Sequence, residues 1–493
     1  MTRRLAAVDL GAQSGRVAVG TFDGDALSVE EVHRFANVPV TAGGVLRWDF
    51  DALQRDVRDG LRAASRDADV DSVAVDSWGV DFGLVDDAQG LLENPVNYRD
   101  TRRANAVESV YARVPARELY ERTGIQLLPI NTIFELAALA AERDPALAAA
   151  DRLLLIPDLF HRWLAGSDTT ELTNATTTQC YDPVAGTWAG DLLARLGVPA
   201  GVLPDVVAPG TPLGPETATA AGETGLRRAT VIAVATHDTG SAVAAAPFAR
   251  PGSIFLSVGT WSLVGVELDE PLITDETYDA NLTNEGGVAG TTRLLRNVTG
   301  LWLLHECRRA WAEQGQDVSF EQLVELARSS PPFGPLIDPN AGLFLEPGNM
   351  PERIARFCAA TGQRPPADAG ETARCILESL ALKHAETVEL LRRVAGVEPA
   401  ELYVLGGGAR NELLCRWTAE ASRLPVLAGP EEATVVGNLL VQAMALGEVG
   451  SIDEARAIVR RSFALTTYEP EHADAWAGAR ERFAALAHPE VSV

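Results

Sequence analysis

Apolar stretches broken by a short polar turn occur twice, once near the start of each half of the chain. In residues 5–20 the apolar run LAAVDL is followed by the turn GAQSG at 11–15 and by a second apolar run. Residues 253–266 repeat this order, with Gly-Thr at 259–260 as the turn. Each pattern predicts two strands joined by a tight turn. Because the backbone amides of turns can bind anions, the repetition indicates two related domains, each with a turn suited to phosphate.

The remaining hydrophobic pattern predicts further strands and helices, and a chain of 493 residues is too long for a single core. Apolar residues recur with a helical period in 371–394, and the proline- and glycine-rich segment 199–215 predicts a surface loop. A change in composition at 244–251 predicts a domain junction, which gives an N-terminal domain over 1–245 and a C-terminal domain over 246–493. The other predicted strands cover 72–76, 80–85, 231–235 and 402–405, and the other predicted helices cover 51–64, 132–141 and 412–422.

The charge of the chain argues against several kinds of partner. Its 42 Lys and Arg residues and 68 Asp and Glu residues give a net charge of −26, which repels nucleic acids and anionic membranes. An anionic ligand would therefore need local compensation from a metal ion, backbone amides or a few arginines. No apolar run approaches the roughly 18 residues of a membrane span. The run after the basic start ends at Val8, too short for a signal peptide, so we expect a cytoplasmic protein.

Lysine is almost absent, and this limits how a phosphate group can be bound. Lys383 is the only lysine in the sequence, and neither Gly-Lys-Ser nor Gly-Lys-Thr occurs. A Walker P-loop and the strand lysine of protein kinases are therefore excluded. Any ATP that the protein binds must be held by another phosphate cradle.

The cysteines give no support for zinc ligation or thioredoxin-like redox chemistry, because none of them stands in a CxxC spacing. Their odd number also argues against a disulfide framework. Cys358 and Cys375 could form a disulfide if they lie close in space, which the sequence leaves open. The five cysteines are Cys180, Cys307, Cys358, Cys375 and Cys415.

A polar segment, Thr-His-Asp-Thr-Gly at 236–240, follows the predicted strand at 231–235 and precedes an alanine-rich stretch. In α/β proteins a catalytic carboxylate usually stands at the end of a buried strand. Asp238 is therefore the candidate catalytic group. The alternative is that Asp238 only caps the following helix, and the segment by itself leaves both interpretations open.

Three glycines at 406–408 connect the predicted strand at 402–405 to the predicted helix at 412–422. Glycines in a strand-to-helix turn let a ligand approach the backbone, so this turn is a candidate for binding the adenosine end of a nucleotide. A plain tight turn is the alternative. Asn411 stands where the GxGxxG pattern needs its last glycine, so NAD binding gains little support.

Taken together, these segments resemble the FGGY carbohydrate kinases, whose fold is that of the actin-like (ribonuclease H-like) ATPases. The resemblance runs in order from residue 5 to about residue 445, so it covers nearly the whole chain. The first hairpin and the triple glycine are shared widely in the superfamily, whereas the stretches at 77–81, 124–132 and 173–179 resemble the members that act on L-rhamnulose. The matching stretches lie at 8–17, 76–82, 124–132, 173–179, 237–239, 259–263, 283–287, 297–304 and 406–408.

The resemblance implies an α/β protein with two actin-like (ribonuclease H-like) domains around a central cleft. It implies ATP-dependent phosphorylation of L-rhamnulose at the 1-hydroxyl, giving L-rhamnulose 1-phosphate in rhamnose degradation, with Asp238 as the proton acceptor. His305 departs from the family, where a glutamine is expected, although a histidine can still donate one hydrogen bond. The implied sugar contacts are Gly79, His237, Asp238, Thr239 and Asn297, and the implied ATP contacts are Ala12, Gln13, Ser14, Gly15, Arg16, Thr260, His305 and Gly407.

The residues of the first turn suit the binding of magnesium and phosphate. Asp9 ends the first predicted strand, and we expect it to hold Mg²⁺ through water, since magnesium keeps much of its hydration shell. A turn-stabilising contact is the alternative role of Asp9. We expect Arg16 and the hydroxyls of Ser14 and Thr260 to clamp the phosphates. Arg16 can also be interpreted as a solvated charge at a strand edge.

Trp78 is suited either to stack on an apolar sugar face or to pack in the core. Asn297 offers both a donor and an acceptor, which suits a polyol. The adjacent Arg102 and Arg103 are expected at a solvated helix start.

Other functions stay open. The first is a kinase for another ketose, such as L-fuculose or a pentulose, although related pentulose kinases usually carry a Lys and Trp pair after Gly124 that this chain lacks. The second is an actin-like ATPase that acts as a switch or filament, and the third is a nicotinamide dehydrogenase. The expected partners are a small sugar and ATP, and the protein is expected to be a monomer or a small homo-oligomer.

Overall fold

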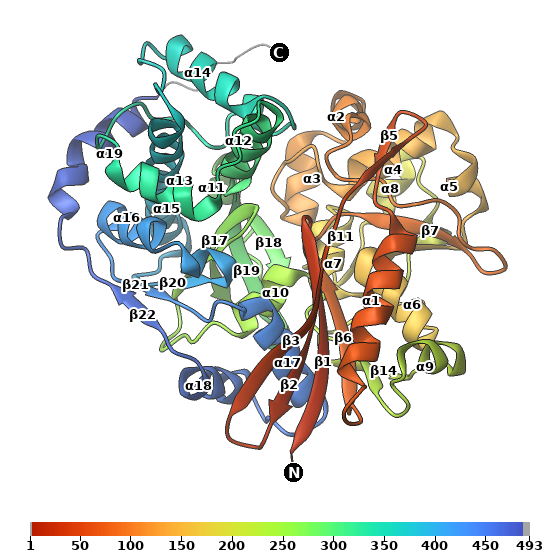
Figure 1. Cartoon of the computed structure of the whole chain (residues 1–493). Helices are drawn as coiled ribbons and strands as arrows, with labels where there is room; N and C mark the ends of the chain where they lie inside the picture. The colour runs from red at the N-terminus through yellow and green to blue at the C-terminus, as the bar shows by residue number, and fades with distance from the viewer. Residues whose placement is uncertain (1, 487–493) are drawn as a thin grey trace. The chain divides into compact units, whose positions relative to one another are not determined.

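The computed structural model describes residues 2–486 and divides into two compact units (Figure 1). Unit 1 combines the segment that ends at Pro247 with the later segments Glu267–Leu294 and Ala433–Phe463. Unit 2 combines Phe248–Val266 and Leu295–Glu432 with the segment that begins at Ala464. The chain therefore passes between the units several times, and neither unit is continuous in sequence.

A six-stranded sheet forms the centre of unit 1, in the order β14-β15-β6-β1-β2-β3 within the described residues. β1 (Arg3–Leu10) is antiparallel to β2 (Ser14–Phe22) and parallel to β6 (Ser72–Ser77), which is parallel to β15 (Thr230–Ala233). Because β1, β6 and β15 run in the same direction, their carboxyl ends meet at one edge of the sheet. The outer strands are β3 (Leu27–Ala36) and β14 (Thr211–Pro215).

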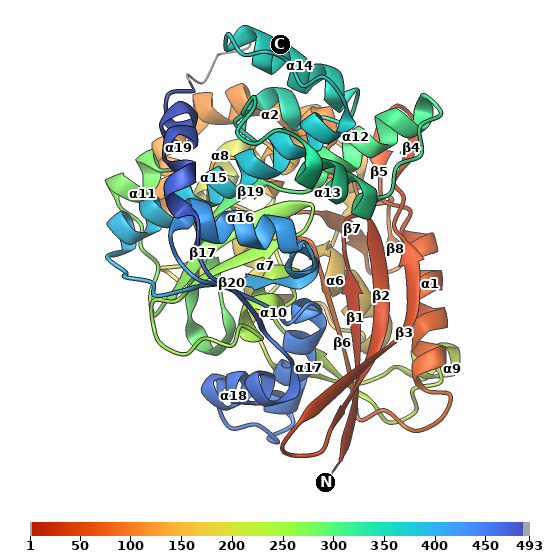
Figure 2. The ribbon, with the colours of Figure 1, turned by 60° about the vertical axis from the view of Figure 1, so that its left-hand side comes forward.

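Two helices cover opposite faces of this sheet (Figure 2). Gly60 of α1 (Phe50–Ala64) packs so closely on Val17 that an added Cβ would lie 2.4 Å from it, and an added Cβ on Gly20 would lie 2.7 Å from Leu439 of α17 (Ala433–Ala445). Val17 and Gly20 are three residues apart on β2, so they point to opposite faces. The sheet is therefore buried on both sides, which fits the nearly unbroken apolar sequence of β1.

The other elements of unit 1 surround this core, and β7 pairs with β8 and β9 in a separate small sheet. No helix in residues 2–486 combines the length and the hydrophobicity needed to cross a membrane. The further helices are α2 (Thr101–Arg113), α3 (Ala116–Thr123), α4 (Thr132–Glu142), α5 (Pro145–Ala149), α6 (Ile156–Ala165), α7 (Leu172–Thr177), α8 (Gly190–Leu196), η1 (Ala200–Val202), α9 (Ala218–Thr224), α10 (Asp238–Ala244), α11 (Asp275–Asp279), η2 (Val288–Gly290) and α18 (Ile452–Ser462). The further strands are β4 (Val40–Ala42), β5 (Val45–Arg47), β7 (Phe82–Asp86), β8 (Gly90–Leu91), β9 (Arg152–Leu155), β10 (Thr170–Glu171), β11 (Tyr181–Asp182), β12 (Thr187–Trp188), β13 (Val206–Val207) and β18 (Thr283–Gly286).

Unit 2 repeats the central strand arrangement of unit 1. β16 (Ile254–Val258) is antiparallel to β17 (Trp261–Leu268) and parallel to β20 (Leu402–Leu405), as β1 is to β2 and β6. The two hairpins predicted from the sequence therefore hold equivalent places in the two units. The further elements are β19 (Thr292–Thr299), which begins in unit 1, α12 (Trp302–Glu313), α13 (Phe320–Ser329), η3 (Gly342–Phe344), α14 (Met350–Ala360), α15 (Ala369–Ala395), η4 (Gly406–Arg410), α16 (Glu412–Ser422), β21 (Val426–Ala428), β22 (Thr466–Tyr468), η5 (Ala473–Trp476) and α19 (Ala477–Ala484).

The hydrophobic pattern located most of these elements. Helix α16 and strand β20 have the predicted bounds, and α1, α4 and α15 exceed theirs by one or two residues at an end. The prediction of a loop over 199–215 is wrong in part, because η1, β13 and β14 lie within it, with β14 at the edge of the unit 1 sheet. An edge strand tolerates Pro212 and Pro215, since a missing N–H at the edge need not break a ladder.

Candidate active site

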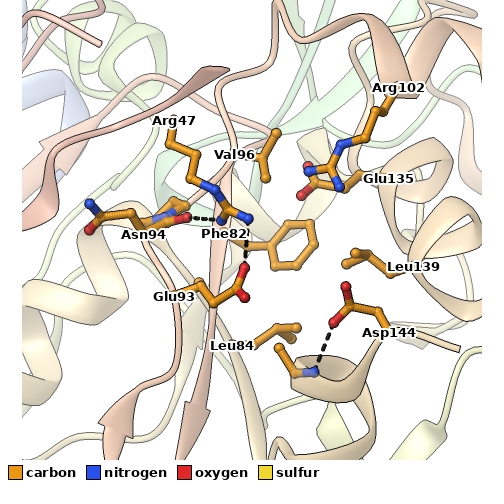
Figure 3. A pocket seen from close by; sticks show the side chains of 13 residues that line it. Arg47, Phe82, Leu84, Glu93, Asn94, Val96, Arg102, Glu135, Leu139 and Asp144 are labelled. Atoms are coloured by element: carbon orange, nitrogen blue, oxygen red, sulfur yellow. Dashed lines mark hydrogen bonds and ion pairs between the residues drawn. The ribbon is translucent and has the colours of Figure 1, made fainter. Parts of the chain in front are cut away.

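A pocket in unit 1 is lined by charged side chains, but none of the predicted site residues lines it (Figure 3). Arg47 donates hydrogen bonds to the carbonyl of Asn94 (2.5 Å) and to Glu93 (2.6 Å), so its charge is already paired. Across the pocket, Arg102 lies beside Glu135. Arg102 forms an ion pair with Asp100 (3.4 Å), and Glu135 forms one with Arg103, so these charges are also paired with protein groups.

The expectation of a solvated start for α2 is wrong for Arg103. This side chain is 1% exposed, and it pairs with Asp81 (2.6 Å) and with Glu135. The carboxylate of Asp81 also accepts hydrogen bonds from the indole N–H groups of Trp48 (2.6 Å) and Trp78 (2.9 Å). Arg103 therefore neutralises two buried acids, a role that a charge next to a helix start does not reveal in the sequence.

Trp78 and Gly79 lie in a tightly held turn after β6. Trp78 is 6% exposed, and its ring lies 4.3 Å from that of Trp48. An added Cβ on Gly79 would lie 2.9 Å from the hydroxyl of Thr177. Val80 has a φ of 68°, which is rare for a β-branched residue, and its N–H donates to the same hydroxyl (3.1 Å). Such a strained backbone often marks a functional site.

Three aspartates gather at the carboxyl edge of the unit 1 sheet. Asp9 and Asp76 are paired residues on β1 and β6, and Asp238 begins α10, with four residues between it and the end of β15. The bridge between Ser77 and His237 brings the ends of β6 and β15 together, and the N–H of Ser77 donates to the carbonyl of Thr236 (2.9 Å). The parallel strands thus bring together acids that are far apart in the sequence.

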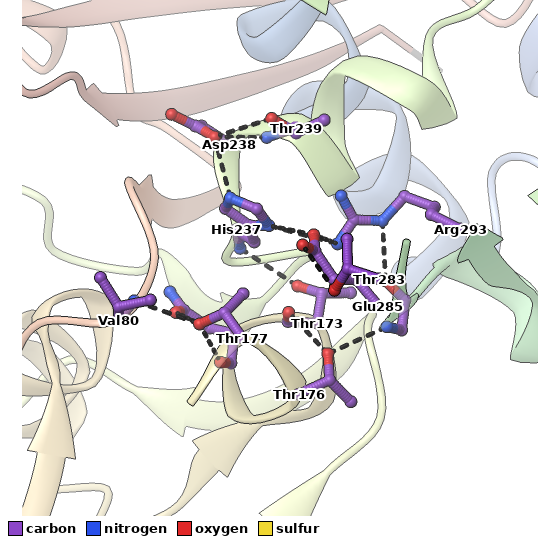
Figure 4. Close-up of polar contacts among 12 residues, drawn as sticks. Val80, Thr173, Thr176, Thr177, His237, Asp238, Thr239, Thr283, Glu285 and Arg293 are labelled. Atoms are coloured by element: carbon purple, nitrogen blue, oxygen red, sulfur yellow. Dashed lines mark hydrogen bonds and ion pairs between the residues drawn. The ribbon is translucent and has the colours of Figure 1, made fainter. Parts of the chain in front are cut away.

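Asp238 has one oxygen held by the protein and one that is not. Its Oδ1 accepts hydrogen bonds from the N–H (2.5 Å) and the hydroxyl (3.1 Å) of Thr239, and lies 3.4 Å from Nε2 of His237 (Figure 4). Within residues 2–486, Oδ2 has no hydrogen bond. The side chain keeps 30% of its surface exposed. Burial raises the pKa of Asp238, the nearby Asp9 adds to this, and His237 and Thr239 oppose it.

Asp238 is not the N-cap of α10, because His237 holds that position, and the His237 side chain accepts no hydrogen bond from the first turn. Its contacts with Thr239 tie it to the first turn of the helix all the same. Capping of α10 therefore gives no role to Oδ2 of Asp238, which makes no hydrogen bond within residues 2–486.

The surroundings of Asp76 indicate whether this edge of the sheet suits a magnesium ion. It is fully buried, and while Oδ2 accepts from Asn438 (2.6 Å), Oδ1 has no partner within the described residues. Burial, together with the charges of Asp9 and Asp238, holds the pKa of Asp76 well above its usual range. A cation would relieve this repulsion, and carboxylate oxygens are the ligands that Mg²⁺ prefers. No three acidic, histidine or cysteine side chains in residues 2–486 form a complete metal ligand set, so such an ion would keep water ligands.

The first turn leads from Asp9 to Arg16, and these two residues pair across the hairpin. Arg16 donates to Oδ2 of Asp9 through Nε (2.9 Å) and Nη2 (2.6 Å). At the tip, Gln13 and Ser14 are exposed. Gly11 is needed because an added Cβ would lie 2.9 Å from the carbonyl oxygen of Ser14. The tip can therefore present backbone amides and the Ser14 hydroxyl to a ligand. The turn also contains Ala12 and Gly15.

The remaining predicted residues lie in unit 2, and most of them gather at the carboxyl edge of its sheet. Thr260 forms the turn between β16 and β17, and its carbonyl accepts from Gly300 (3.1 Å) and Trp302 (3.2 Å) at the start of α12. Gly407 follows the neighbouring strand β20 and has open space where a side chain would be. Asn297 lies half-buried on β19.

His305 lies one turn into α12 and stacks on Phe320, with ring centroids 5.9 Å apart. Burial lowers the pKa of His305, and the nearby Arg308 lowers it further. The ring is therefore neutral at pH 7 and presents one N–H and one lone pair.

Two charged residues behind His237 were missed by sequence reasoning. Glu285 on β18 and Arg293 on β19 lie 3.3 Å apart, and each lies 3.2 Å from Nδ1 of His237 (Figure 4). Glu285 lies within one of the matching stretches, but nothing in its spacing connects it to His237. The cysteines of the described residues are free and buried, although the thiols of Cys358 and Cys375 lie within hydrogen-bonding contact of each other.

Sequence comparison identifies the family. The N-terminal domain of the FGGY family of carbohydrate kinases matches residues 5–245, and the C-terminal domain of that family matches residues 254–446. The chain belongs to the FGGY family of carbohydrate kinases. Within the family it is similar to a rhamnulokinase of Bacteroides thetaiotaomicron, with 42% identity over 484 residues that cover 98% of this chain and 99% of the relative. A rhamnulokinase of Pectobacterium carotovorum is 40% identical and covers 99% of this chain and 98% of its own length.

Solved structures of carbohydrate kinases share the fold. Gluconate kinase from Lactobacillus acidophilus superposes with a TM-score of 0.78 at 17% identity, over 99% of this chain and 98% of that one. Xylulose kinase from Rhodospirillum rubrum gives a TM-score of 0.77 at 21% identity, over 98% of each chain. The α/β class and the two-domain, actin-like architecture expected from the sequence are therefore confirmed.

Proposed function

We propose that this FGGY kinase transfers a phosphoryl group from ATP to the 1-hydroxyl of L-rhamnulose, giving L-rhamnulose 1-phosphate. The observation that carries the kinase chemistry is the partly exposed carboxylate of Asp238, which has an unoccupied acceptor oxygen at the carboxyl edge of the sheet. The choice of sugar rests on the relatives named rhamnulokinase, which match nearly the whole chain at 40–42% identity.

Asp238 is the proposed general base. The sugar hydroxyl would approach Oδ2, because Oδ1 is already held by Thr239. The proton of the hydroxyl passes to Oδ2 while its oxygen bonds to the γ-phosphorus and the bond to the leaving ADP breaks. The raised pKa of Asp238 makes the carboxylate a better proton acceptor. Much of its effect is positioning, because phosphoryl transfer has a loose transition state.

Both units contribute to the proposed binding of ATP. In unit 1 the amides of the turn from Ala12 to Arg16 and the Ser14 hydroxyl would bind phosphate oxygens without any lysine. In unit 2 the corresponding residues are Thr260, His305 and Gly407. Asp9 would hold Mg²⁺ through water, with Asp76 beside it on β6. The ion would supply charge neutralisation for the phosphates.

The proposed sugar contacts are His237, Thr239 and Gly79 in unit 1 and Asn297 in unit 2. Trp78 is the weakest member of this set, because its indole N–H and its ring are both engaged by protein groups. We further propose a cytoplasmic monomer or small homo-oligomer that binds neither nucleic acids nor membranes. We also propose that residues 1–245 supply the sugar site, the first phosphate turn and the base, and that residues 246–493 supply the second turn and the adenosine-binding glycines.

The test is an assay of ADP release with Mg²⁺-ATP across a panel of ketoses, followed by identification of the sugar phosphate. We expect L-rhamnulose to give the highest kcat/KM and a 1-phosphate product. Asp238→Asn, which is nearly isosteric, should lower kcat by about 10²–10⁴ while ATP binding persists. The matched control is Asp51→Asn, an exposed aspartate on α1, which should keep wild-type turnover.

Other outcomes of this assay would assign other functions. A higher kcat/KM with L-fuculose or a pentulose would keep the kinase and replace the sugar. ATP hydrolysis that no ketose stimulates would instead favour an actin-like ATPase. Wild-type turnover of Asp238→Asn would remove Asp238 from the reaction.

A further inference from the structure

A buried set of charged side chains lies behind the proposed base. Arg293 is fully buried, and its Nη2 lies 3.2 Å from Nδ1 of His237 and 3.3 Å from Oε2 of Glu285. The Nε of Arg293 donates to the carbonyl of Gly286 (2.9 Å), which fixes the direction of the guanidinium. On its other side, His237 presents Nε2 to Oδ1 of Asp238 at 3.4 Å. Figure 4 shows His237 lying between Asp238 and the pair formed by Glu285 and Arg293.

The contact with Arg293 decides which nitrogen of His237 carries the proton. A guanidinium has only N–H donors, so the nitrogen that it contacts must offer a lone pair. Oε2 of Glu285 lies equally close to Nδ1 (3.2 Å), but it makes no hydrogen bond within the described residues, whereas the contact with Arg293 has hydrogen-bond geometry. Nδ1 is therefore the acceptor, and the ring proton is on Nε2, the nitrogen that faces Asp238. Nη2 of Arg293 carries two N–H groups, so it can reach Nδ1 and Glu285 at the same time.

Glu285 keeps Arg293 in place. Burial acts to raise the pKa of Glu285, but the charge of Arg293 opposes it, and the pKa is lowered. Glu285 is therefore ionised and balances the buried guanidinium. The hydroxyl of Thr283 on the same strand donates to Oε1 of Glu285 (3.5 Å), and Oε2 makes no hydrogen bond within the described residues.

We propose that Arg293 and Glu285 are positioning residues for the base. Arg293 fixes the Nε2–H form of His237, and this N–H, together with Thr239, holds Oδ1 of Asp238 so that Oδ2 faces the acceptor hydroxyl. This role rests on the proposed function, since it needs Asp238 to act as the base. No proton leaves His237 in the reaction.

The tautomer can be measured without any substrate. In protein labelled with ¹⁵N-histidine, two-bond ¹H–¹⁵N correlation spectra at pH 7.5 distinguish the two neutral forms from the charged ring, and comparison with His237→Gln assigns the signals. We expect the Nε2–H form in the wild type. In Arg293→Met we expect the Nδ1–H form, because Glu285 becomes the remaining partner of Nδ1. A protonated ring or an Nδ1–H form in the wild type would overturn the proposal.

The kinetic test uses Glu285→Gln. In this variant no negative charge holds the Arg293 guanidinium in place. We expect kcat to fall by about tenfold to a hundredfold, because a small misplacement of a catalytic group has an effect of this size. KM for ATP should be unchanged. The matched control is Glu378→Gln in unit 2, a glutamate that is also buried and paired with an arginine, Arg374 (2.7 Å). It should lose stability without losing kcat.

A double variant separates positioning from a general loss of structure. If Glu285 acts through Asp238, Glu285→Gln should lower kcat in the wild type but add no further loss to Asp238→Asn. Additive losses would overturn the proposal. The failure of this proposal and the failure of the proposed function give different results. If the wild type phosphorylates no ketose, the proposed function fails, whereas the histidine spectra still show which nitrogen of His237 carries the proton.

Discussion

Asp9 and Asp76 stand side by side in register on the parallel strands β1 and β6, one residue before each strand ends. Asp9 is paired with Arg16, whereas Asp76 is fully buried and one of its oxygens lacks a partner within residues 2–486. Burial and the charge of Asp9 raise the pKa of Asp76, and a cation at this edge would favour its ionised form. This arrangement suits a bound cation beside the turn between β1 and β2.

The first prediction concerns that cation. Removal of divalent ions with a chelator should abolish ADP release, and added Mg²⁺ should restore it. Asp9→Asn should raise the Mg²⁺ concentration for half-maximal activity by about tenfold to a hundredfold, the range for groups that act on a metal through its ligands. Titration of activity with Mg²⁺ measures this. An unchanged half-maximal concentration in Asp9→Asn, with Asp51→Asn as the control, would contradict the assignment.

The second prediction concerns Gly437 on α17, where an added Cβ would lie 1.7 Å from the carbonyl oxygen of Ser241 on α10. Gly437→Ala should therefore push α10 and Asp238 away and destabilise the protein by about 1–3 kcal/mol, with a loss of kcat. Gly222→Ala on α9 is the matched control, because nothing lies near its added Cβ. It should stabilise the protein by about 0.5–1 kcal/mol. Urea unfolding of both variants measures the difference, and equal effects would refute the close helix contact.

The third prediction concerns the buried pair of Arg103 and Asp81. Arg103→Met leaves Asp81 and Glu135 without their cation, so the free energy of unfolding should fall by about 3–5 kcal/mol. Arg34→Met removes a pair with Glu31 at the surface and should cost at most about 1 kcal/mol. Thermal or urea unfolding compares the two. If both variants lost a similar free energy of unfolding, the buried pair of Arg103 and Asp81 would stabilise the protein no more than the surface pair.

The fourth prediction concerns pH. Burial raises the pKa of Glu216 from 4.5 to about 7, although a hydrogen bond from Thr224 acts against it. The folded protein therefore binds this proton more tightly than the unfolded chain, and the stability from Glu216 is present below pH 4.5 and lost as pH rises through 7. Glu216→Gln cannot ionise, so its free energy of unfolding should fall less between pH 5 and pH 8 than that of the wild type.

The control for this prediction is Glu142→Gln, an exposed glutamate at the end of α4. It should keep the pH dependence of the wild type. If Glu216→Gln and the wild type show the same slope, burial of Glu216 does not shift its ionisation as inferred.

The elements that local patterns dictate were predictable. Helices such as α16 have an apolar face with helical spacing and an Asn411 cap, and hairpins such as β1-β2 have an apolar run on each side of a glycine turn. These signals lie within a few residues of one another, so no tertiary information is needed. The edge strand β14 was missed because its prolines are typical of loops and only a neighbouring strand makes it part of a sheet.

The sequence by itself determined the family and the two hairpins and supplied Asp238 as the candidate base, because each depends on residue types at short spacing. Only the tertiary structure decided which side chains contact one another. Examples are the burial of Arg103 between two acids, the register of Asp9 with Asp76, and the contact of Arg293 with His237. Burial and charge pairing depend on which distant strands lie side by side, and Glu285 and Arg293 approach His237 across a gap of about fifty residues in sequence that no local pattern bridges.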